Sequence, residues 1–468
     1  MRRFAGLAVV LSTLGLAAVV VLVIALAHPR PFWDPAVTRI FGIDVHYDLH
    51  APAVWIIVAA VVIAVAAGLG VAVQESRAAN RTRRALPEQQ RHPLAPRRIM
   101  ALTRGQFAGE MTITALIPAH NEEDCIAATL ASLGRQTTPP DRIVVVADNC
   151  TDRTVEIARA AGVEVIETVG NTAKKAGALN QALAQILPGQ GDNDTILVMD
   201  ADTEISGERF LETARRRMTA DRALMAVGGL FHGEAGPGLL RQFQRNEYTR
   251  YGREIERRRG KVFVLSGTAS VFRPAALRAV AEARGRSLPG VPGDIYDTVA
   301  LTEDNEITIA IKTLGGLIVS PSECTVTTEL MPNWSMLWKQ RLRWQRGALE
   351  NLSAYGVTPT TVRYWSQQIG IGYSVIALTA YLSLLVIFAL SIDQWVWFAF
   401  WTLIGALFVA ERVVTVWRGG WKARILAALV LPELLYDLFI DVVFVKGVID
   451  MAFGRNATWS HVGTEATT

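Results

Sequence analysis

The sequence predicts an α/β domain with a mostly parallel sheet, inserted between transmembrane helices. Strand-like and helix-like patterns alternate from residue 112 to about residue 353, as they do in βαβ units. Before this region, residues 7–27 and 51–73 are two uncharged apolar runs, each long enough to span a bilayer. A chain of 468 residues that is 51% hydrophobic can supply both a globular core and several membrane helices.

The distribution of arginines predicts how the chain is oriented. Residues 28–50, between the two apolar runs, contain Arg30 and Arg39, whereas seven arginines lie between Arg77 and Arg98. Because basic loops stay on the cytoplasmic side, we expect a multi-pass membrane protein, in contact with membrane lipids, whose α/β domain is cytoplasmic. Three apolar segments near the C-terminus predict further crossings: residues 369–392, 395–410 and 425–449.

These observations divide the chain into four parts. Residues 1–75 are expected to form two transmembrane helices, and residues 76–110 an Arg-rich cytoplasmic linker. Residues 111–353 are expected to form the α/β domain. Residues 354–468 are expected to form three transmembrane or interfacial helices and a short tail.

Composition and motifs argue against several classes of protein. The net charge of +4 mostly reflects the arginines that flank the apolar runs, so nucleic acid is not an expected partner. No Gly-x-x-x-x-Gly-Lys-Ser/Thr or Gly-x-Gly-x-x-Gly sequence follows the first strand, which disfavours a P-loop NTPase or a nicotinamide dinucleotide site. The seven histidines lack zinc-ligand spacing, and three scattered cysteines suit a cytoplasmic domain without disulfides.

The α/β region begins with a buried strand. The segment TITALIPA, residues 112–119, is apolar, and NEEDCIAATLASL has helical periodicity after Asn121, which we expect to cap the helix. The following segments alternate in the same way. They are the strand DRIVVVAD (141–148), the helix TDRTVEIARAAG (151–162), the strand VEVIET (163–168), the helix KKAGALNQALAQIL (174–187) and the strand TILVMD (195–200).

Charged side chains follow three of these strands. Glu122 follows the first strand, Asp148 ends the second, and Asp200 and Asp202 follow the fourth, while Lys175 begins the helix before it. The carboxyl ends of parallel strands meet at one edge of a sheet, where ligands bind in open α/β folds. Two carboxylates about 4 Å apart would repel by roughly 4 kcal/mol at an effective dielectric of 20. A divalent cation carrying a diphosphate would offset this repulsion, but Asp-x-Asp pairs also occur by chance.

Six segments together resemble the family 2 glycosyltransferases, in the order found in that family. They are TALIPAHNEE, VVVADNCTDRT, KAGALNQAL, VMDADT, LTEDNEI and WKQRLRWQRG. The last two resemble the membrane-embedded processive synthases of cellulose, chitin, hyaluronan and poly-N-acetylglucosamine, and LMPNWSMLWKQRLRWQRG most resembles the poly-N-acetylglucosamine branch. The resemblance covers about 240 residues and implies a GT-A catalytic domain with a Rossmann-like sheet.

The resemblance also implies roles for individual residues. Asp148 would bind the uracil and ribose of a UDP-sugar, Lys175 would bind the diphosphate, and Asp200 and Asp202 would hold Mg²⁺ or Mn²⁺ with the donor. Asp304 would be the general base that deprotonates the acceptor hydroxyl, which gives inversion at the anomeric carbon. Other substrate-binding candidates are Glu122, Thr268, Glu303 and the Gln-x-x-Arg-Trp residues Gln340, Arg343 and Trp344.

Simpler interpretations of two motifs remain open. TEDNEI could be the first turn of a helix whose acids merely suit the helix dipole. QRLRWQRG could be a basic amphipathic helix at the membrane surface, an interpretation that is compatible with a role in binding. No Phe-x-Val-Thr-x-Lys segment and no C-terminal cyclic-dinucleotide domain are present, so cellulose is a less favoured product.

The last apolar segment contains acidic residues on one helical face. Glu433, Asp437 and Asp441 recur every four residues. Acids at membrane depth usually face protein or water, so these could line a polysaccharide channel. Alternatively, the helix after Pro432 could be interfacial and never cross the membrane.

Three functions are therefore weighed. The first is a processive synthase that polymerises a UDP-hexose, with UDP-N-acetylglucosamine the best guess, and threads the growing polysaccharide outward, with export or periplasmic partner proteins. The second is a non-processive transferase that adds one sugar to a lipid acceptor. The third is an inactive subunit that binds nucleotide sugars within an export complex.

Overall fold

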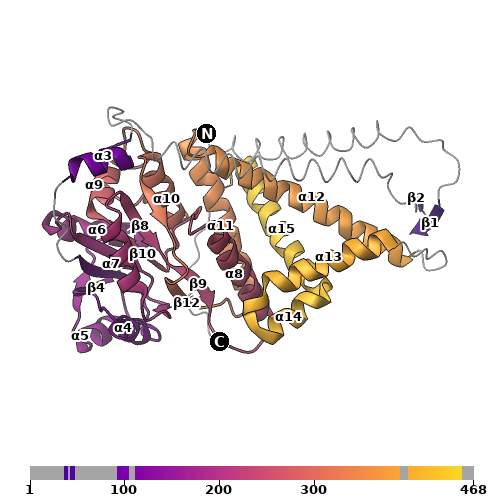
Figure 1. Cartoon of the computed structure of the whole chain (residues 1–468), viewed down its shortest axis with the longest axis horizontal. Helices are drawn as coiled ribbons and strands as arrows, with labels where there is room; N and C mark the ends of the chain where they lie inside the picture. Colours follow the sequence, from indigo (N-terminus) through magenta and orange to yellow (C-terminus); the bar gives the residue numbers. More distant parts are fainter. Residues whose placement is uncertain (1–35, 41–42, 48–91, 105–110, 391–398, 456–468) are drawn as a thin grey trace. The chain divides into compact units, whose positions relative to one another are not determined.

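The computed structural model describes residues 36–40, 43–47, 92–104, 111–390 and 399–455. The chain forms two compact units, one built from residues 78–362 and the other from residues 1–77 and 363–456, and each is described by itself (Figure 1). The predicted membrane segments at residues 7–27 and 51–73, and most of the Arg-rich linker, lie outside the described residues.

A seven-stranded sheet forms the centre of the first unit, in the spatial order β11–β8–β10–β6–β3–β4–β5. Strand β10 runs antiparallel to its neighbours β6 and β8, and the other described pairs in this sheet are parallel. The strands are β3 (Thr112–Ala119), β4 (Arg142–Ala147), β5 (Glu164–Glu167), β6 (Asp194–Met199), β8 (Leu224–Gly228), β10 (Ala269–Phe272) and β11 (Leu317–Val319). This confirms the predicted α/β architecture with a mostly parallel sheet.

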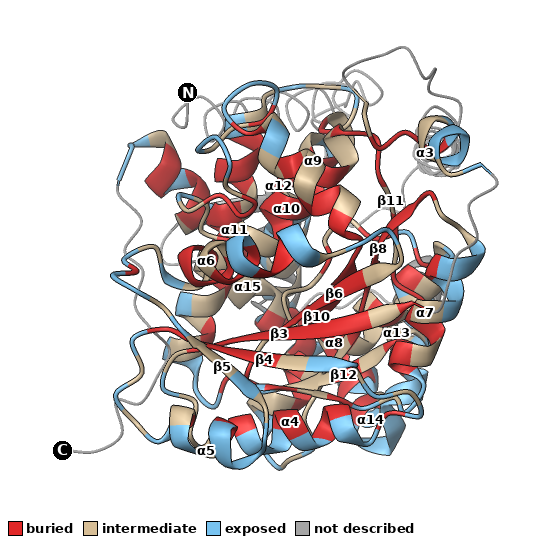
Figure 2. Cartoon of the chain, turned by 90° about the vertical axis from the view of Figure 1, so that its left-hand side faces the viewer, coloured by how far each residue is buried: buried red, intermediate tan, exposed pale blue. Residues whose placement is uncertain are grey.

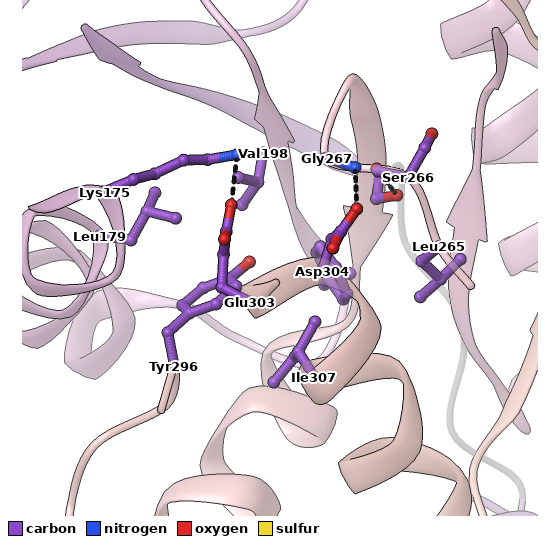
Figure 3. A pocket seen from close by; sticks show the side chains of 12 residues that line it. Lys175, Leu179, Val198, Leu265, Ser266, Gly267, Tyr296, Glu303, Asp304 and Ile307 are labelled. Carbon is purple, nitrogen blue, oxygen red and sulfur yellow. Dashed lines mark hydrogen bonds and ion pairs between the residues drawn. The ribbon is translucent and has the colours of Figure 1, made fainter. Parts of the chain in front are cut away.

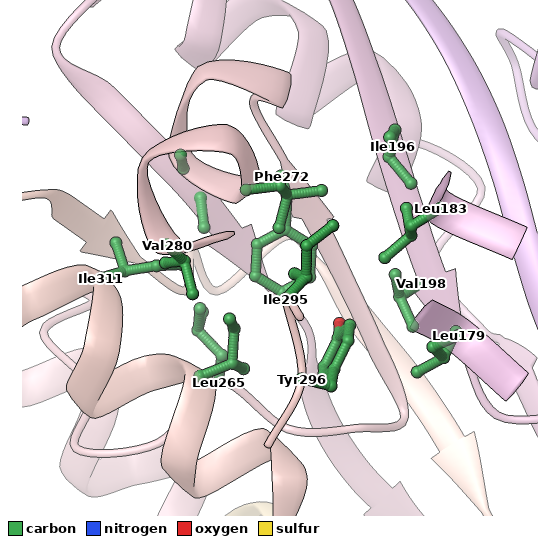
Figure 4. Packing of buried hydrophobic residues seen from close by; sticks show 14 of the residues in the cluster. Leu179, Leu183, Ile196, Val198, Leu265, Phe272, Val280, Ile295, Tyr296 and Ile311 are labelled. Carbon is green, nitrogen blue, oxygen red and sulfur yellow. The ribbon is translucent and has the colours of Figure 1, made fainter. Parts of the chain in front are cut away.

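Helices cover both faces of this sheet, because successive residues of a buried strand point to opposite sides. Leu116 and Val198 point to the face covered by α6, α9 and α10, as Figure 4 shows for Val198. Ile117 and Leu197 point to the face covered by α4 and α7. Figure 2 shows the strands as a buried layer between partly exposed helices. The helices of this unit are α3 (Pro96–Leu102), α4 (Ile126–Gly134), α5 (Thr154–Ala160), α6 (Lys174–Ile186), α7 (Phe210–Ala220), α8 (Leu239–Arg257), α9 (Pro274–Ala283), α10 (Glu303–Thr313) and α11 (Trp334–Tyr355).

A second, three-stranded sheet was not predicted from the sequence. It contains β7 (Thr203–Ile205), β9 (Leu230–Gly233) and β12 (Thr325–Thr328), in the order β7–β12–β9. These strands have only three or four residues, too few to show a periodic pattern. The sheet is important for the site because β7 begins directly after Asp202.

The prediction that Asn121 caps a helix was wrong. Asn121 has a left-handed backbone with a φ of 58°, and helix α4 begins only at Ile126. The carboxamide oxygen of Asn121 instead accepts a hydrogen bond from the Thr151 backbone N–H at 2.7 Å. Asn121 therefore joins the loops that follow β3 and β4. The predicted absence of disulfides is confirmed for the three cysteines, Cys125, Cys150 and Cys324, which are free.

The second unit contains a short hairpin and four helices among its described residues. They are β1 (Ala36–Ile40), β2 (Ile43–Tyr47), α12 (Val362–Leu390), α13 (Ala399–Thr415), α14 (Gly420–Leu429) and α15 (Leu431–Ala452). No helix in the described part of the chain combines the length and the apolar content needed to cross a bilayer. The predicted C-terminal crossings are thus not confirmed by these helices, and residues 391–398 lie outside the described part.

The predicted segment 425–449 is two helices, not one. Val430 has a φ of 56°, which ends α14, and Pro432 then stands in the first turn of α15, where its missing N–H is not needed. In α15, Glu433 and Asp437 form ion pairs with Arg412 of α13 at 3.4 Å and 2.5 Å. Two of the three acids of this face, Glu433 and Asp437, therefore have a cation partner within their own unit.

Candidate active site

The parallel strands bring the predicted acidic residues to one edge of the main sheet. Strands β4 and β6 flank β3 in parallel register, so Asp148 and Asp200, which follow them, lie at the same edge as Glu122. Strand β10 enters this edge in the opposite direction, with Ala269 beside Met199. Its preceding backbone therefore reaches the site, and the Thr268 carbonyl accepts a hydrogen bond from the Asp200 N–H at 3.3 Å.

Lys175 joins two segments of the site through ion pairs. Its Nζ lies 2.5 Å from Asp200 Oδ1 and 2.8 Å from Glu303 Oε1, and all three side chains are between 22% and 29% exposed. Figure 3 shows the Lys175–Glu303 pair at the pocket. Although burial alone would raise it, the ion pair with Lys175 lowers the pKa of Glu303. Helix α6 thereby connects the end of β6 with the start of α10.

Asp304 lies beside this ion pair and faces the same pocket. Its Oδ2 accepts a hydrogen bond from the Gly267 N–H at 3.2 Å (Figure 3). Its Oδ1 accepts one from the Asn305 N–H at 2.7 Å. Burial, together with the charge of Glu303, raises the pKa of Asp304 to about 6. A carboxylate with this pKa is ionised at neutral pH and is a better proton acceptor than an exposed aspartate.

The pocket around these groups has a charged rim and an apolar wall. Its empty space is about 270 Å³, including the part that is open to solvent. A Cβ at Gly267 would lie 3.0 Å from Lys175 Nζ and 3.2 Å from Asp200 Oδ2, so any larger residue here would require these side chains to shift by a few tenths of an ångström. The pocket is lined by Lys175, Leu179, Val198, Leu265, Ser266, Gly267, Ser270, Phe272, Tyr296, Glu303, Asp304 and Ile307.

Asp200 and Asp202 fit a divalent cation that also binds a diphosphate. Burial raises the pKa of Asp200 to about 6 against the opposing effect of Lys175, and repulsion from Asp202 adds to the rise. A cation would relieve this repulsion. Within the described residues, no group of three or more His, Cys, Asp or Glu side chains is arranged to hold a metal ion. Asp200 and Asp202 could hold Mg²⁺ or Mn²⁺ only if the ion took most of its ligands from phosphate and water.

Two further predicted residues lie along the same edge. Asp148 is buried, and its Oδ1 accepts hydrogen bonds from Thr168 Oγ1 and Asn171 Nδ2, each at 2.8 Å. Burial raises the pKa of Glu122 to about 7 against the opposing hydrogen bond from Cys125, and the charges of Asp202 and Asp200 add to the rise. Glu122 is therefore coupled electrostatically to the proposed cation site.

Helix α11 supplies the three residues of the Gln-x-x-Arg-Trp motif. The positive charge of Lys175 is the main cause that lowers the pKa of Glu303, and the charge of Arg343 adds a smaller effect in the same direction. Arg343 therefore lies close enough to the pocket to influence its charged groups. The Trp344 ring is covered by the guanidinium of Arg341 at 4.2 Å from its centroid. Gln340 accepts a hydrogen bond from Arg341 Nη1 at 3.0 Å. One face of Trp344 is thus occupied by the protein itself.

The structure also adds residues that sequence reasoning missed. Gly267 and Tyr296 line the pocket, although only the neighbouring Thr268 was named, and the Thr268 hydroxyl instead bonds with Ser266 Oγ at 2.7 Å. Glu329 follows β12, whose Thr328 is paired with Thr203, so it lies one step from Asp202. Gly267 directly precedes the predicted contact Thr268, so that segment of the sequence could have indicated it, but no sequence signal indicated Tyr296.

Part of the α/β domain is similar to a known protein family. Residues 114–281 match the family described as Glycosyl transferase family 2. These residues contain Asp148, Lys175, Asp200 and Asp202, whereas Asp304 and α11 follow the matched segment. This segment is therefore similar to the family 2 glycosyltransferases, in agreement with the predicted enzyme class, a hexosyltransferase.

Curated relatives match about half of the chain. This chain is 31% identical over 248 residues to the probable glycosyltransferase YdaM of Bacillus subtilis (strain 168). The match covers 50% of this chain and 54% of YdaM. This chain is also 26% identical over 250 residues to the poly-beta-1,6-N-acetyl-D-glucosamine synthase of Staphylococcus aureus (strain MSSA476). That match covers 51% of this chain and 55% of the synthase. The chain thus spans about half the length of these curated relatives.

Solved structures with a similar arrangement are more distant in sequence. The mannosyltransferase PcManGT from Pyrobaculum calidifontis, in complex with GDP-Man and Mn²⁺, is 16% identical, with a TM-score of 0.48 over 84% of this chain and 98% of that chain. The glucosyl-3-phosphoglycerate synthase from Mycobacterium tuberculosis, in complex with Mn²⁺, UDP-glucose and phosphoglyceric acid, is 18% identical, with a TM-score of 0.35. That match covers 56% of this chain and 83% of the synthase chain.

Proposed function

We propose that this chain is an inverting, processive β-glycosyltransferase. It would polymerise a UDP-sugar, with UDP-N-acetylglucosamine the best candidate, into an extracellular polysaccharide and translocate the product across the membrane. The observation that carries the proposal is that Lys175 and Asp304, from separate segments of the chain, line one pocket, and that Lys175 is also ion-paired with Asp200 from a third segment.

Asp304 acts as the general base in this proposal. Its carboxylate takes the proton of an acceptor hydroxyl while the hydroxyl oxygen forms a bond to the anomeric carbon of the donor. The bond between that carbon and the UDP oxygen breaks on the opposite side, so the configuration inverts. A positioned base of this kind contributes about 10²–10⁴ in rate. The N–H groups of Gly267 and Asn305 hold the carboxylate in place.

The leaving UDP is held by cationic groups at the same edge. Lys175, which is paired with Asp200 and Glu303 in the structure, can instead contact the diphosphate, and Arg343 adds positive charge nearby. When bound at Asp200 and Asp202, Mg²⁺ or Mn²⁺ would stabilise the charge that develops on the diphosphate. Donors placed where charge develops are worth more in a partly buried site than in water.

The remaining candidates would bind the two ends of the substrate pair. Asp148 would hold the uridine part of the donor, because its carboxylate is fixed at the end of β4 by Thr168 and Asn171. Glu122 would be a further substrate contact, and Thr268 would lie near the acceptor. Trp344 would stack on the acceptor sugar through the ring face that Arg341 leaves uncovered, with Gln340 beside it.

Polymerisation and export are supported by similarity and by sequence pattern. The relative from Staphylococcus aureus is named as a synthase of poly-beta-1,6-N-acetyl-D-glucosamine. The apolar runs at residues 7–27 and 51–73 would anchor the chain in the bacterial inner membrane, with the catalytic domain on the cytoplasmic side. Export or periplasmic partner proteins would then receive the product.

The proposal is tested by incubating the purified full chain in lipid with Mg²⁺ or Mn²⁺ and a panel of labelled UDP-sugars. We expect incorporation from one UDP-sugar, and a fall of about 10²–10⁴ in rate for Asp304→Asn with UDP binding retained. Asp192→Asn, in an exposed loop that carries a second Asp-x-Asp pair, is the matched control and should keep full activity. Normal turnover by Asp304→Asn would show that the base is elsewhere.

A second candidate is transfer of a single sugar to a lipid acceptor. YdaM is named only as a probable glycosyltransferase, so the similarity to it does not distinguish synthesis of a polymer from transfer of a single sugar. Sizing the product distinguishes the two functions. A ladder or long polymer supports processive synthesis, whereas a single added sugar on lipid supports the second candidate.

A further inference from the structure

Behind the candidate base lies a buried ion pair between Arg284 and Glu306. Arg284 follows α9, Glu306 lies in the first turn of α10, and their side chains are 0% and 1% exposed. The pair is bidentate, with Nη1 to Oε1 at 2.5 Å and Nη2 to Oε2 at 2.6 Å. Glu306 is two residues from Asp304, and neither the proposed chemistry nor the comparisons assign it a role.

Tyr355, at the end of α11, completes this cluster. Its hydroxyl donates a short hydrogen bond to Glu306 Oε1. Glu306 therefore accepts bonds from two segments that flank α10, one before it in the chain and one after it. A buried ion pair seldom adds net stability compared with apolar residues of similar size, so fold stability alone does not account for the cluster. Its geometry is better explained by a need for fixed positions.

Arg284 also holds the wall of the pocket. Its two terminal nitrogens donate hydrogen bonds to the carbonyls of Pro289 at 2.8 Å and Ile295 at 2.7 Å. Ile295 precedes Tyr296, which lines the pocket and lies beside Glu303 in Figure 3. The loop from 289 to 296 is therefore tied to the same guanidinium that holds the base helix.

A second set of contacts joins α11 to the start of α10. Asn351 Nδ2 donates hydrogen bonds to the Thr302 carbonyl at 3.2 Å and to Asn305 Oδ1 at 3.1 Å. A Cβ at Gly347 would lie 2.5 Å from Thr302 Oγ1, so the two helices approach closely only because this residue is glycine. The helix that carries Arg343 and Trp344 is thus fastened to both sides of Asp304.

We propose that Arg284, Glu306 and Tyr355 form a positioning cluster that holds the candidate base, the pocket wall at Tyr296 and helix α11 in one fixed arrangement. These residues do not touch substrate but determine where Asp304 lies relative to a donor and an acceptor. The inference rests on the proposed function, because Asp304 has to be the base for its position to limit the rate.

The test is Tyr355→Phe, which removes one hydroxyl and keeps the ring. We expect kcat to fall roughly tenfold, less than the ~10²-fold loss that a 1 Å misplacement can cause. The KM for the UDP-sugar and the Kd for UDP should stay within about twofold of wild type. Tyr251→Phe is the matched control, because its ring stays stacked on Phe231 and α8 carries no part of the cluster. It should keep wild-type kcat.

Hydrogen exchange provides a second measurement that needs no activity. Amides of residues 303–308 should exchange faster in Tyr355→Phe and in Asn351→Ala than in wild type, while those of β3 stay unchanged. Asn351→Ala removes different hydrogen bonds to the start of the same helix, α10. If Tyr355→Phe does not fold, kcat and hydrogen exchange are measured in Asn351→Ala instead.

The outcomes separate this inference from the proposed function. Wild-type kcat in both variants, or a loss of kcat matched by an equal loss of UDP affinity or folded protein, would overturn the positioning role. If wild type transfers no sugar from any donor, the proposed function fails. In that case unchanged exchange in α10 still overturns the inference, and faster exchange supports the structural part of it.

Discussion

The rate of sugar transfer should fall about tenfold between about pH 7 and about pH 5. Burial and the charge of Glu303 raise the pKa of Asp304 to about 6. A base has to be ionised to accept a proton, so roughly 90% of the enzyme is competent at the higher pH and roughly 10% at the lower. An unperturbed aspartate, with a pKa near 3.9, would leave the rate nearly constant over this range.

Two variants should move this pH dependence in opposite directions. Glu303→Gln removes a negative charge that raises the pKa of Asp304, so the fall in rate should occur at lower pH. Lys175→Met removes a positive charge that lowers the same pKa, so the fall should occur at higher pH. Both variants should also lower the maximal rate, because each removes a candidate substrate contact.

The assay is the initial rate of UDP release with saturating donor and metal, measured at intervals across this range with stability checked at each pH. Saturating metal keeps Asp200, whose pKa is also about 6, ionised. Repeating the profile in Glu122→Gln removes the carboxyl whose pKa is about 7, so the dependence that remains in that variant reports Asp304. A wild-type rate that is independent of pH, or a shift of the same sign in both variants, would refute the assignment of Asp304 as the base.

Other predictions test the cation, the glycine and the buried ion pair. Chelating the divalent cation should abolish sugar transfer, and adding Mg²⁺ or Mn²⁺ should restore it. In titrations of the rate against metal concentration, Asp202→Asn should weaken activation by the metal, whereas Asp192→Asn should not. Gly267→Ala should weaken UDP-sugar binding about tenfold in calorimetry, because the added Cβ displaces Lys175, and unchanged affinity would contradict the close approach. Arg284→Met should lower the free energy of unfolding in urea by about 3–5 kcal/mol, because Glu306 is left buried and unpaired. A loss under about 1 kcal/mol would show that Glu306 finds another partner.

Local patterns were sufficient for the strands and for most of the acidic edge. The strand at Thr112–Ala119 and the helix that starts at Lys174 lie where their apolar patterns predict them, because each packs one continuous or periodic apolar surface against the core. The carboxylates of Asp148 and Asp200 follow from strand ends, since parallel strands deliver their ends to one edge.

Local patterns failed where a distant segment determined the conformation. Asn121 has the residue type of a helix cap, but its carboxamide bonds with the backbone of Thr151, thirty residues later, and the helix starts further on. Strands β7, β9 and β12 are too short to show a pattern, yet they pair with one another and place Glu329 near Asp202.

The sequence by itself determined the family-like motifs, the main strands in their order along the chain, and the identity of the charged groups. These features depend on residue type and on neighbours along the chain. Only the tertiary structure decided that Lys175 pairs with both Asp200 and Glu303, that Gly267 lies against Lys175 and Asp200, and that Arg284 and Tyr355 meet on Glu306 behind the base. Such contacts depend on how the sheet and helices pack, and their free energy is gained only when segments remote in the chain meet.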